Sequence, residues 1–538
     1  MGPAGGGSVP AWSRRAVVWR AVVWWAVASL SALLALWPGA VAAAQQAGGL
    51  PVVLVHGLNS TFSTWAPYLG PDGFLATIGR QGYAVGDGQA PGTMLTGDPD
   101  DPFAPTNTIA QNAEVLRDYI AGVKEETDAE RVDLIAHSLG GLISRYYVDR
   151  LMSGRDVNRL IMLGTPNAGA ACAVLPARLD IATPATVELR PRYVREVFNR
   201  QITRQHGVPF HTLAGTAYDN PVQSPCADVP SDLLVSVASV EATGAPGEQL
   251  PLGHSDLVDS AQAFQDFVAP TLAREPETVA DTPLPPPPEE LQFVTLATGH
   301  VPAGGTSEQV VNLDDVAVAS FAVYDPSHSL RVSVRGASGD RIELDPVANG
   351  LIQVDDPQTL VHLGYGFDQP APGPWRVTLH ATAGTPPTGA DYAVTAQVHG
   401  GAVFTASTST LLAAPGEPVR VAALLERGGE PLAVRHAFAL VRDLAGGEEV
   451  VRLTGDGERT GTWTPAREGL HSVDVVVVGE APDGTVVERS AFLAVEVRDP
   501  EASIWRSVLP WAGAGTGVLL LLAVAGVVGY RRLGRATP

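Results

Sequence analysis

The stretch Val132-Asp133-Leu134-Ile135-Ala136-His137-Ser138-Leu139-Gly140-Gly141 decides the fold. Its apolar first half predicts a buried strand, and the residues after Ser138, up to Tyr147, predict a helix. A serine on a tight strand-to-helix turn projects its hydroxyl out of the sheet, beside the first N–H groups of the helix. The pattern is G-x-S-x-G with the small residue Ala136 at the first glycine. Ser138 is therefore a candidate nucleophile. A plain Ser-Gly helix start is the alternative, so the rest of the chain has to decide.

Length and composition predict a globular protein of several domains. The chain has 538 residues, of which 45% are hydrophobic and 17% charged, and a chain of this length is expected to divide into about three domains. Its formal net charge of -22 argues against nucleic acid as a partner and against electrostatic attraction to anionic lipid.

The N-terminus resembles an export signal. Arg14, Arg15 and Arg20 precede an apolar run over 21–37, and small residues follow over 40–44. This order of charged, apolar and small segments predicts a secretory signal peptide over residues 1–44. We therefore expect an exported protein.

The C-terminus predicts a membrane anchor. An apolar run over 518–528, extended by 512–517 to about 20 residues, is long enough to span a bilayer. Arg531, Arg532 and Arg535 follow and place the C-terminus inside. We expect a transmembrane helix over 510–530 and a cytoplasmic tail over 531–538. The alternative is cell-wall attachment, because residues 509–513 (LPWAG) resemble a sortase signal with Ala512 at the threonine position.

Residues 48–274 alternate predicted strands and helices. Strands that are apolar on both faces and alternate with helices indicate a mostly parallel sheet flanked by helices, which is an α/β fold. The predicted helix covers 106–127, capped by Asn107 or Thr108, and the predicted strands cover 50–55, 85–88, 132–136, 159–163, 210–215 and 233–240.

A proline-rich linker over 275–290 separates this domain from two all-β units. Short alternating strands with Gly, Pro and Asp turns predict a β-sandwich over 291–398 and a second one over 399–498, which resembles Ig-like modules of bacterial surface proteins. The simplest role for both sandwiches is a stalk that holds the first domain off the membrane.

The chain contains two cysteines, Cys172 and Cys226. An even pair in an exported chain predicts one disulfide.

A serine nucleophile needs a histidine base, which in turn needs a carboxylate. When the serine lies on such a strand-to-helix turn, the acid and then the histidine follow it in the chain. Three histidines lie between Ser138 and the linker, namely His206, His211 and His254. His254 follows a candidate acid and lies in a late loop before the last helix, so it is the candidate base.

Three carboxylates compete for the role of the acid. Asp232 stands at the start of the strand predicted over 233–240, which precedes His254. Asp219 and Asp228 are the alternatives, one in a loop after a strand and one beside Cys226. We prefer Asp232 because it stands at the mouth of the strand that precedes His254.

Acyl transfer also needs two backbone donors for the oxyanion. Leu139, which follows the nucleophile, supplies one N–H group. The loop His56-Gly57-Leu58 follows the first strand, and Gly57 permits a close approach, so the N–H of Leu58 is the second candidate donor.

Three segments together resemble the bacterial lipase/esterase family of α/β-hydrolases, namely Val53–Ser60, Asp133–Tyr147 and Leu163–Gly169. The resemblance covers 50–272. It implies Ser138 as nucleophile, Asp232 as acid, His254 as base, and Leu58 and Leu139 as oxyanion donors.

The resemblance has one departure at the acid motif, where Leu233 follows Asp232 in place of the usual glycine. It also implies that a disulfide between Cys172 and Cys226 would steady the acid loop. No residues match the calcium site of such lipases, so we expect no metal and no cofactor.

Residues 170–205 lie between two predicted core strands and include a predicted helix over 192–204. The segment is interpreted either as a lid over the acyl pocket or as a standard crossover connection.

These features predict an extracytoplasmic serine hydrolase that cleaves carboxylic esters, most simply lipids, through an acyl-enzyme. An acyltransferase or amidase on the same fold is one alternative, and a surface adhesin with an inactive hydrolase domain is another. The expected partners are an ester or lipid substrate and the membrane bound by the C-terminal helix.

Overall fold

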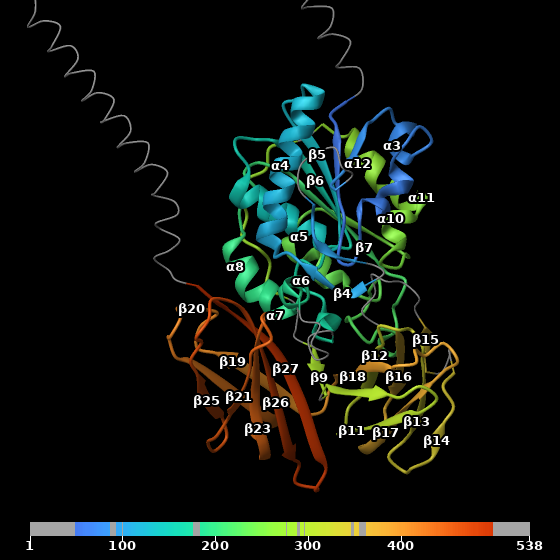
Figure 1. The fold of residues 1–538 in the computed structure, drawn as a ribbon, viewed down its shortest axis with the longest axis vertical. Helices are drawn as coiled ribbons and strands as arrows, with labels where there is room; N and C mark the ends of the chain where they lie inside the picture. Colours follow the sequence, from blue (N-terminus) through green and yellow to red (C-terminus); the bar gives the residue numbers. More distant parts are fainter. Residues whose placement is uncertain are drawn as a thin grey trace, which may run out of the picture.

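The computed structural model describes residues 49–498, apart from 87–92, 99–100, 176–182, 276, 288–290, 295, 346–348 and 354–361. The predicted signal peptide, membrane helix, sortase-like signal and tail lie outside the described residues. No helix within the described ranges is long and apolar enough to cross a membrane. The described chain forms an α/β domain (up to residue 274), a first sandwich (from residue 291) and an Ig-like sandwich (from residue 402), which lie together in Figure 1.

Six parallel strands form the sheet of the α/β domain, in the order β2-β1-β5-β6-β7-β8. The bounds are β1 Val52–Val55, β2 Gly82–Ala84, β5 Val132–His137, β6 Val157–Leu163, β7 Phe210–Gly215 and β8 Gly247–Leu250. A small hairpin, β3 Thr96–Asp98 and β4 Asp101–Thr106, lies outside this sheet. The predicted parallel sheet is confirmed.

The central strands are apolar throughout because both faces of the sheet are covered. Along β5, Leu134 and Ala136 pack on one side and Ile135 on the other. The first side carries α4 Ile109–Thr127 and α5 Leu139–Tyr146. The second side carries α10 Asp256–Asp259, α11 Ala261–Ala263 and α12 Ala269–Ala273 (Figure 1). The shorter helices are α3 Phe74–Thr77, α6 Pro184–Glu188, α7 Pro191–Tyr193, α8 Asn199–Gln201 and α9 Val237–Val240.

The helix predicted over 106–127 is confirmed, with Thr108 as its cap. The Thr108 side chain accepts a hydrogen bond from the N–H of Gln111, and the Gln111 side chain accepts one from the N–H of Thr108. This reciprocal capping box satisfies two N–H groups that have no partner within the helix. The helix ends at Asp128, which has a left-handed conformation with φ 53°.

One predicted strand is wrong. Residues 233–240 form no strand, because Ser236 caps a short helix, α9, by accepting from the N–H of Ser239. The apolar residues there are buried in a loop, and β8 occupies the position beside β7. Of the strand predicted over 85–88, residues 87 and 88 lie outside the described residues and 85–86 form a turn. The strand lies earlier, at β2, and Val85 donates its N–H to Leu54 O.

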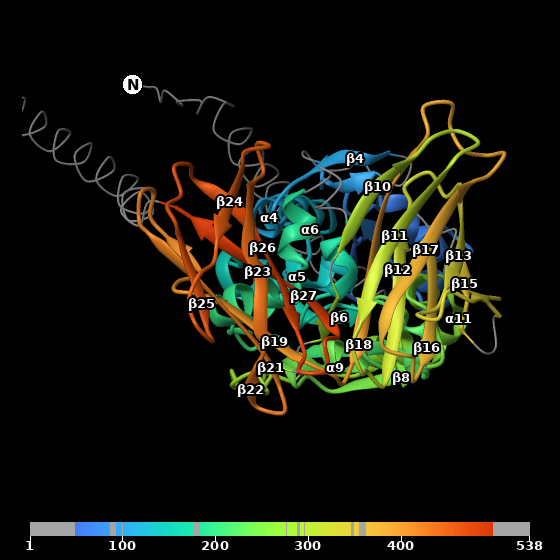
Figure 2. The same cartoon turned by 90° about the horizontal axis from the view of Figure 1, so that it is seen from below.

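The two sandwiches share one sheet. The strand β9 Gln292–Phe293 pairs with β18 Ala390–His399 of the first sandwich and with β27 Val486–Val497 of the Ig-like sandwich. This link creates an eleven-stranded sheet that runs through both units, side by side in Figure 2. The first sandwich also contains β10 Ala297–Val301, β11 Thr306–Leu313, β12 Val318–Tyr324, β13 Leu330–Arg335, β14 Arg341–Ile342, β15 Ile352–Gln353, β16 Leu363–Asp368 and β17 Gly373–Ala381. The Ig-like sandwich contains β19 Val403–Thr408, β20 Leu412–Ala413, β21 Val419–Arg427, β22 Glu430–Pro431, β23 Ala433–Asp443, β24 Glu448–Arg452, β25 Arg459–Trp463 and β26 Gly469–Glu480.

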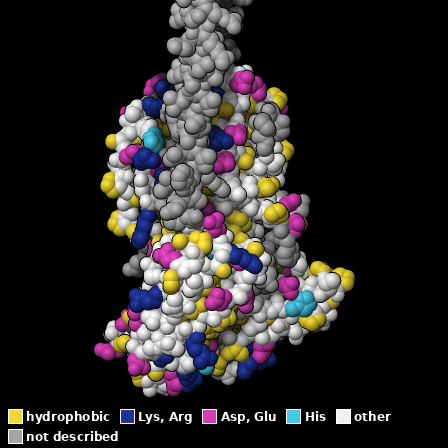
Figure 3. Space-filling model, turned by 60° about the vertical axis from the view of Figure 1, so that its left-hand side comes forward, with side chains coloured by type: hydrophobic (Ala, Val, Ile, Leu, Met, Phe, Trp, Pro, Cys, Tyr) yellow, Lys and Arg dark blue, Asp and Glu magenta, His cyan; other side chains and the backbone are white. Residues whose placement is uncertain are grey.

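Both sandwiches dock on the α/β domain, and their role as a stalk that holds this domain off the membrane stays a prediction. Phe293 and Phe492 belong to the same buried cluster as the core of the α/β domain. A buried ion pair joins Arg190 of the α/β domain to Asp474 of the Ig-like sandwich, at 2.9 Å. A buried pair needs a fixed geometry to offset its desolvation, so this contact sets how the two units meet. On the face shown in Figure 3, the described basic and acidic side chains are interspersed over both units.

Candidate active site

Ser138 lies on the turn between β5 and α5, with φ 52° and ψ -127°. This conformation is sparsely populated for residues other than glycine, and it is held by the surrounding chain. The N–H of Ser138 donates to Leu163 O, at 2.9 Å, at the end of β6. Gly140 allows the turn to pack closely, since a Cβ there would lie 2.5 Å from Val55 O. The Ser138 residue is 8% exposed.

The structure brings Asp232 and His254 together. The distance between His254 Nδ1 and Asp232 Oδ2 is 2.7 Å, and the two side chains are 5% and 0% exposed. The other oxygen of Asp232 accepts from the N–H groups of Leu234, at 3.0 Å, and Val235, at 2.7 Å. A carboxylate held in this way accepts a hydrogen bond from the protonated Nδ1, which leaves Nε2 of His254 as the basic nitrogen.

The other sequence candidates lie elsewhere. Asp219 and Asp228 are exposed. His206 donates from Nε2 to Asp149 O, at 3.2 Å. His211 lies in β7, where burial and then the positive charges of two arginines lower its pKa to about 4. Neither of these histidines therefore replaces His254 as a candidate base.

Ser138 and the His254–Asp232 pair meet at the end of β6. Leu163 accepts the Ser138 N–H group, and the next residue, Gly164, contacts both members of the pair. A Cβ at Gly164 would lie 3.1 Å from Asp232 Oδ2 and 3.2 Å from His254 Cε1. Gly164 also has φ 56°, a region that favours glycine. Three residues that are distant in the sequence thus converge on one strand end.

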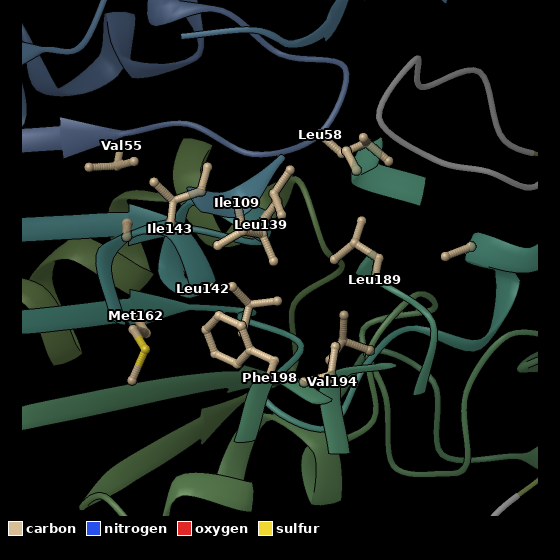
Figure 4. Packing of buried hydrophobic residues seen from close by; sticks show 14 of the residues in the cluster. Val55, Leu58, Ile109, Leu139, Leu142, Ile143, Met162, Leu189, Val194 and Phe198 are labelled. Carbon is tan, nitrogen blue, oxygen red and sulfur yellow. The ribbon is translucent and has the colours of Figure 1, made fainter. Parts of the chain in front are cut away.

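The two candidate oxyanion donors lie on either side of Ser138. The loop after β1 approaches so closely that a Cβ at Gly57 would lie 2.8 Å from the Cβ of Ser138. This contact brings the next residue, Leu58, to the nucleophile. Leu139 begins α5, where N–H groups have no acceptor within the helix. The side chains of Leu58 and Leu139 are buried in one apolar cluster with that of Leu189 (Figure 4).

Two buried histidines beside the site were not predicted to support it. His137 donates from Nε2 to the carbonyl of His254, at 3.1 Å, and burial, with repulsion by His254, keeps its pKa well below the usual value. His56 lies within hydrogen-bond distance of Thr96 Oγ1, at 3.1 Å, and burial lowers its pKa to about 4. Both histidines are therefore neutral at pH 7. His137 contacts the backbone of the candidate base, and His56 Nδ1 lies 3.3 Å from Gly57 O in the oxyanion loop. In the sequence, only their positions next to Gly57 and Ser138 could have indicated this supporting role.

The acid loop is fixed by a strained residue and a disulfide. Leu233, which replaces the glycine of the family motif, has φ 91°, where glycine is favoured. Its side chain is buried, which offsets part of that strain. The predicted disulfide between Cys172 and Cys226 is confirmed, and it ties the start of this loop to the segment after β6. Among the described residues, no group of three or more His, Cys, Asp or Glu side chains could hold a metal ion.

The segment predicted as either a lid or a crossover connects β6 to β7. Its helical part runs over 191–201 in three short pieces, which agrees with the helix predicted over 192–204. Leu189, Val194 and Phe198 point into the apolar cluster beside the oxyanion donors (Figure 4). Arg145 of α5 ties the segment down, because it donates to Asn199 Oδ1 at 2.9 Å. The crossover therefore also forms a wall of the site.

Known proteins resemble parts of this chain in sequence. Residues 51–224 match the family model of palmitoyl protein thioesterase. A triacylglycerol lipase from Burkholderia plantarii is 32% identical over 163 residues, which are 30% of this chain and 41% of the lipase. The chain therefore spans less than half of the length of that curated relative.

Solved structures resemble the fold. The propeptide form of the Bacillus licheniformis lipase BlEst2 matches with a TM-score of 0.54 and 14% identity, over 84% of this chain and 95% of that chain. Its mature form matches with a TM-score of 0.34 and 18% identity, over 42% of this chain and 93% of that chain. The first likeness is a likeness of fold, and it extends beyond the α/β domain into the sandwiches. These matches to lipases and a thioesterase model are what the resemblance to the lipase/esterase family of α/β-hydrolases in the sequence led us to expect.

Proposed function

We propose that this protein is a serine hydrolase that cleaves carboxylic esters through an acyl-enzyme, with lipids as its substrates. One observation carries the proposal: a buried His254–Asp232 pair, at 2.7 Å, meets a serine on a strained strand-to-helix turn at one strand end. The family match and the identity to a lipase support the same class of reaction.

The reaction proceeds in two halves. In the first, Ser138 Oγ attacks the ester carbonyl while His254 Nε2 takes its proton. The carbonyl oxygen becomes an oxyanion that accepts hydrogen bonds from the N–H groups of Leu58 and Leu139. The C–O bond to the alcohol then breaks, and the alcohol leaves with the proton from His254. Asp232 accepts a hydrogen bond from Nδ1 throughout and stabilises the imidazolium.

In the second half, water attacks the acyl-enzyme. His254 Nε2 takes a proton from this water and returns it to Ser138 Oγ as the acyl–serine bond breaks. The products are a carboxylic acid and the free enzyme.

The test is turnover of p-nitrophenyl butyrate by Ser138→Ala. Ser144→Ala is the matched control, because Ser144 lies on the same helix but donates its hydroxyl to Gly140 O. We expect turnover to vanish in the first variant and to persist in the second, with a similar melting temperature for both. Unchanged turnover in Ser138→Ala would contradict the proposal.

A thioester substrate is the second candidate, and the match to the palmitoyl protein thioesterase model favours it. The acyl-enzyme would be the same, with a thiol as the leaving group. Comparing kcat/KM for palmitoyl-CoA and p-nitrophenyl palmitate on the same preparation would separate the two substrates. A ratio well above one would favour the thioester.

We also propose that the enzyme works outside the cell, tethered by its C-terminal helix. The signal-like N-terminus and the apolar run before Arg531 support this location. Extracellular protease should digest the enzyme on intact cells, and a chain ending at residue 505 should appear in the medium. Retention of that truncated chain in the cytoplasm would contradict the proposal.

A further inference from the structure

A single buried threonine, Thr96 of β3, holds the loop that carries one of the candidate oxyanion donors. Its hydroxyl donates to Ser60 O at 3.2 Å and lies 3.1 Å from His56 Nδ1. Its own carbonyl accepts from the N–H of Asn59 at 2.9 Å. Leu58, the candidate donor, lies between His56 and Asn59 in the chain. Thr96 therefore contacts the oxyanion loop, residues 56–60, on both sides of that donor.

The hydroxyl of Thr96 closes a directed chain of hydrogen bonds. A hydroxyl has one proton, which here goes to the carbonyl of Ser60, so the hydroxyl accepts its other hydrogen bond from His56. Burial lowers the pKa of His56 to about 4, so the ring is neutral. Its one proton lies on Nδ1, which is also 3.3 Å from a second acceptor, Gly57 O. His56, Thr96 and Ser60 are each 3% exposed or less, so little water competes for these groups.

Thr96 is itself anchored to a long helix. Asn112 of α4 is fully buried and makes two hydrogen bonds with Leu95, the residue before Thr96. Asn112 Oδ1 accepts from the N–H of Leu95 at 3.0 Å, and Asn112 Nδ2 donates to Leu95 O at 2.9 Å. The helix α4 packs on the same sheet that carries Ser138. The oxyanion loop is therefore fixed to the same framework as the nucleophile.

The oxyanion loop is enclosed between the hairpin and the nucleophile. Asn59 has φ 45°, in the left-handed region that few residues other than glycine adopt. The hairpin approaches Asn59 so closely that a Cβ at Gly97 would lie 2.2 Å from Asn59 Oδ1. On the other side of the loop, a Cβ at Gly57 would lie 2.8 Å from the Cβ of Ser138. A change at the hairpin contact would therefore change the position of the loop relative to Ser138.

We propose that Thr96 is a positioning residue for the reaction: it holds the oxyanion loop so that the N–H of Leu58 meets the oxygen that becomes negative in the transition state. The inference rests on the proposed ester hydrolysis and adds to it a residue from outside the central sheet. An N–H group that is fixed in advance stabilises this charge without reorganising during the reaction. The hydroxyl of Thr96 therefore acts on the transition state and little on the binding of the ester.

Three variants of the full-length protein test this role. Thr96→Val keeps the shape of the side chain and removes the hydroxyl, whereas Thr96→Ser keeps the hydroxyl. Thr106→Val is the matched control, because Thr106 lies opposite Thr96 in the hairpin but accepts from the N–H of Ala185, at 2.9 Å. Each variant is assayed well below its melting temperature, and kcat and KM are measured with p-nitrophenyl butyrate.

Inhibition by a trifluoromethyl ketone supplies a readout that a merely structural role would not change. Ser138 Oγ adds to the carbonyl carbon of the ketone, its proton passes to His254, and the carbonyl oxygen becomes an oxyanion held by the same donors. The inhibition constant therefore measures how well the oxyanion is bound, without turnover.

The loss of one oxyanion donor lowers kcat by about 10²- to 10³-fold. Thr96→Val keeps the donor but loosens its loop, so kcat should fall at least about tenfold while KM changes less than about twofold. The inhibition constant of the ketone should rise by the same factor by which kcat/KM falls. Thr96→Ser, which keeps the hydrogen bonds, should stay within about threefold of the wild type, and Thr106→Val within about twofold.

An unchanged kcat in Thr96→Val, or an equal loss in Thr96→Ser or Thr106→Val, would overturn the proposal. A fall in kcat/KM with no rise in the inhibition constant would also overturn it, because the loss would then not lie in the binding of the oxyanion. If Thr96→Val fails to fold, His56→Leu breaks the same chain of hydrogen bonds at its other end and is judged by the same results. A wild type that hydrolyses no ester would refute the proposed function, and this inference with it.

Discussion

Two histidine–aspartate pairs in this protein have the same separation and opposite surroundings. His254 Nδ1 and Asp232 Oδ2 are 2.7 Å apart, with side chains 5% and 0% exposed. His300 Nδ1 and Asp391 Oδ1 are also 2.7 Å apart, but their side chains are 49% and 61% exposed. The second pair joins opposite positions of β10 and β18 in the first sandwich.

The difference teaches that distance alone does not make a catalytic pair. In water an ion pair gains about 1 kcal/mol at 4 Å, and exposed pairs contribute roughly 0 to 1 kcal/mol. The buried pair has little water to screen it, and backbone N–H groups fix its carboxylate. It also lies beside a strained serine. We expect the buried pair to act and the exposed pair to be passive.

The largest effect should come from removing the buried imidazole. In His254→Ala, kcat for p-nitrophenyl butyrate should fall by about a millionfold, because the serine loses its base. His300→Ala is the matched control and should change kcat by less than about twofold. A comparable fall in both variants would break the contrast between the pairs.

Exchanging only the carboxylate should lower kcat less than removing the imidazole does. In Asp232→Asn the amide offers its own N–H to Nδ1 and stabilises the wrong tautomer, so kcat should fall by about ten-thousandfold. Asp391→Asn makes the same change in the exposed pair and should leave kcat unaltered. If Asp232→Asn kept full activity, Asp232 would not be the acid.

Removing the disulfide tests how much the link between the acid loop and the segment after β6 adds to the stability of the fold. Cys172 and Cys226 are separated by 54 positions, and closing a loop of that length stabilises the fold by about 4 kcal/mol. The double variant Cys172→Ser/Cys226→Ser should therefore melt at a lower temperature than the oxidised wild type. Reduced wild type should melt together with the variant. A variant that melts with the oxidised protein would show that the disulfide adds no stability.

Burial should also shift the pKa of Glu188, a residue near the site. Its carboxyl accepts hydrogen bonds from the N–H of Ile109 and from the hydroxyl of Tyr193. Burial raises its pKa from 4.5 to about 8, against the opposing effect of these hydrogen bonds. Between these two pH values the folded state binds more protons than the unfolded state, so stability falls as pH rises from about 4.5 to 8.

Glu188→Gln stays neutral and should lose this pH dependence. The difference in melting temperature between Glu188→Gln and the wild type should therefore shift in favour of the variant by a few degrees from pH 5 to pH 8.5. This shift corresponds to at least about 1 kcal/mol of stability. Glu248→Gln changes an exposed carboxylate of β8 and serves as the control. A constant difference between wild type and Glu188→Gln across this range would contradict a raised pKa.

The sequence predicted most of the candidate site because, in this fold, topology determines the order of the candidate residues along the chain. The predicted strand-to-helix turn identified Ser138 as the candidate nucleophile. The required chain order, acid and then histidine, left few candidates for the pair that the structure brings together. The candidate acid does pair with His254, but its predicted element was wrong, since Asp232 precedes a capped helix rather than a strand. A short apolar run indicates burial, and a buried loop can carry the same run as a buried strand.

The arrangement of the domains could not be predicted. Arg190 and Asp474 form a buried pair across 284 positions of the chain, and a single pair of that kind leaves no periodic pattern. The strand β9 has two residues, too few for any alternation, yet it joins both sandwiches into one sheet. The sandwiches therefore looked like a stalk in the sequence, although they cover the α/β domain.

The central claim is that Ser138 forms the acyl-enzyme, and covalent labelling tests it most directly. The wild type, treated with a fluorophosphonate and cleaved with trypsin, should carry one phosphonate on the peptide from Val132 to Arg145, which contains Ser138 and Ser144. Fragmentation of this peptide by mass spectrometry should locate the adduct on Ser138, and Ser138→Ala should not be labelled. An adduct on Ser144 or on another peptide, or no adduct on the folded protein, would contradict the claim.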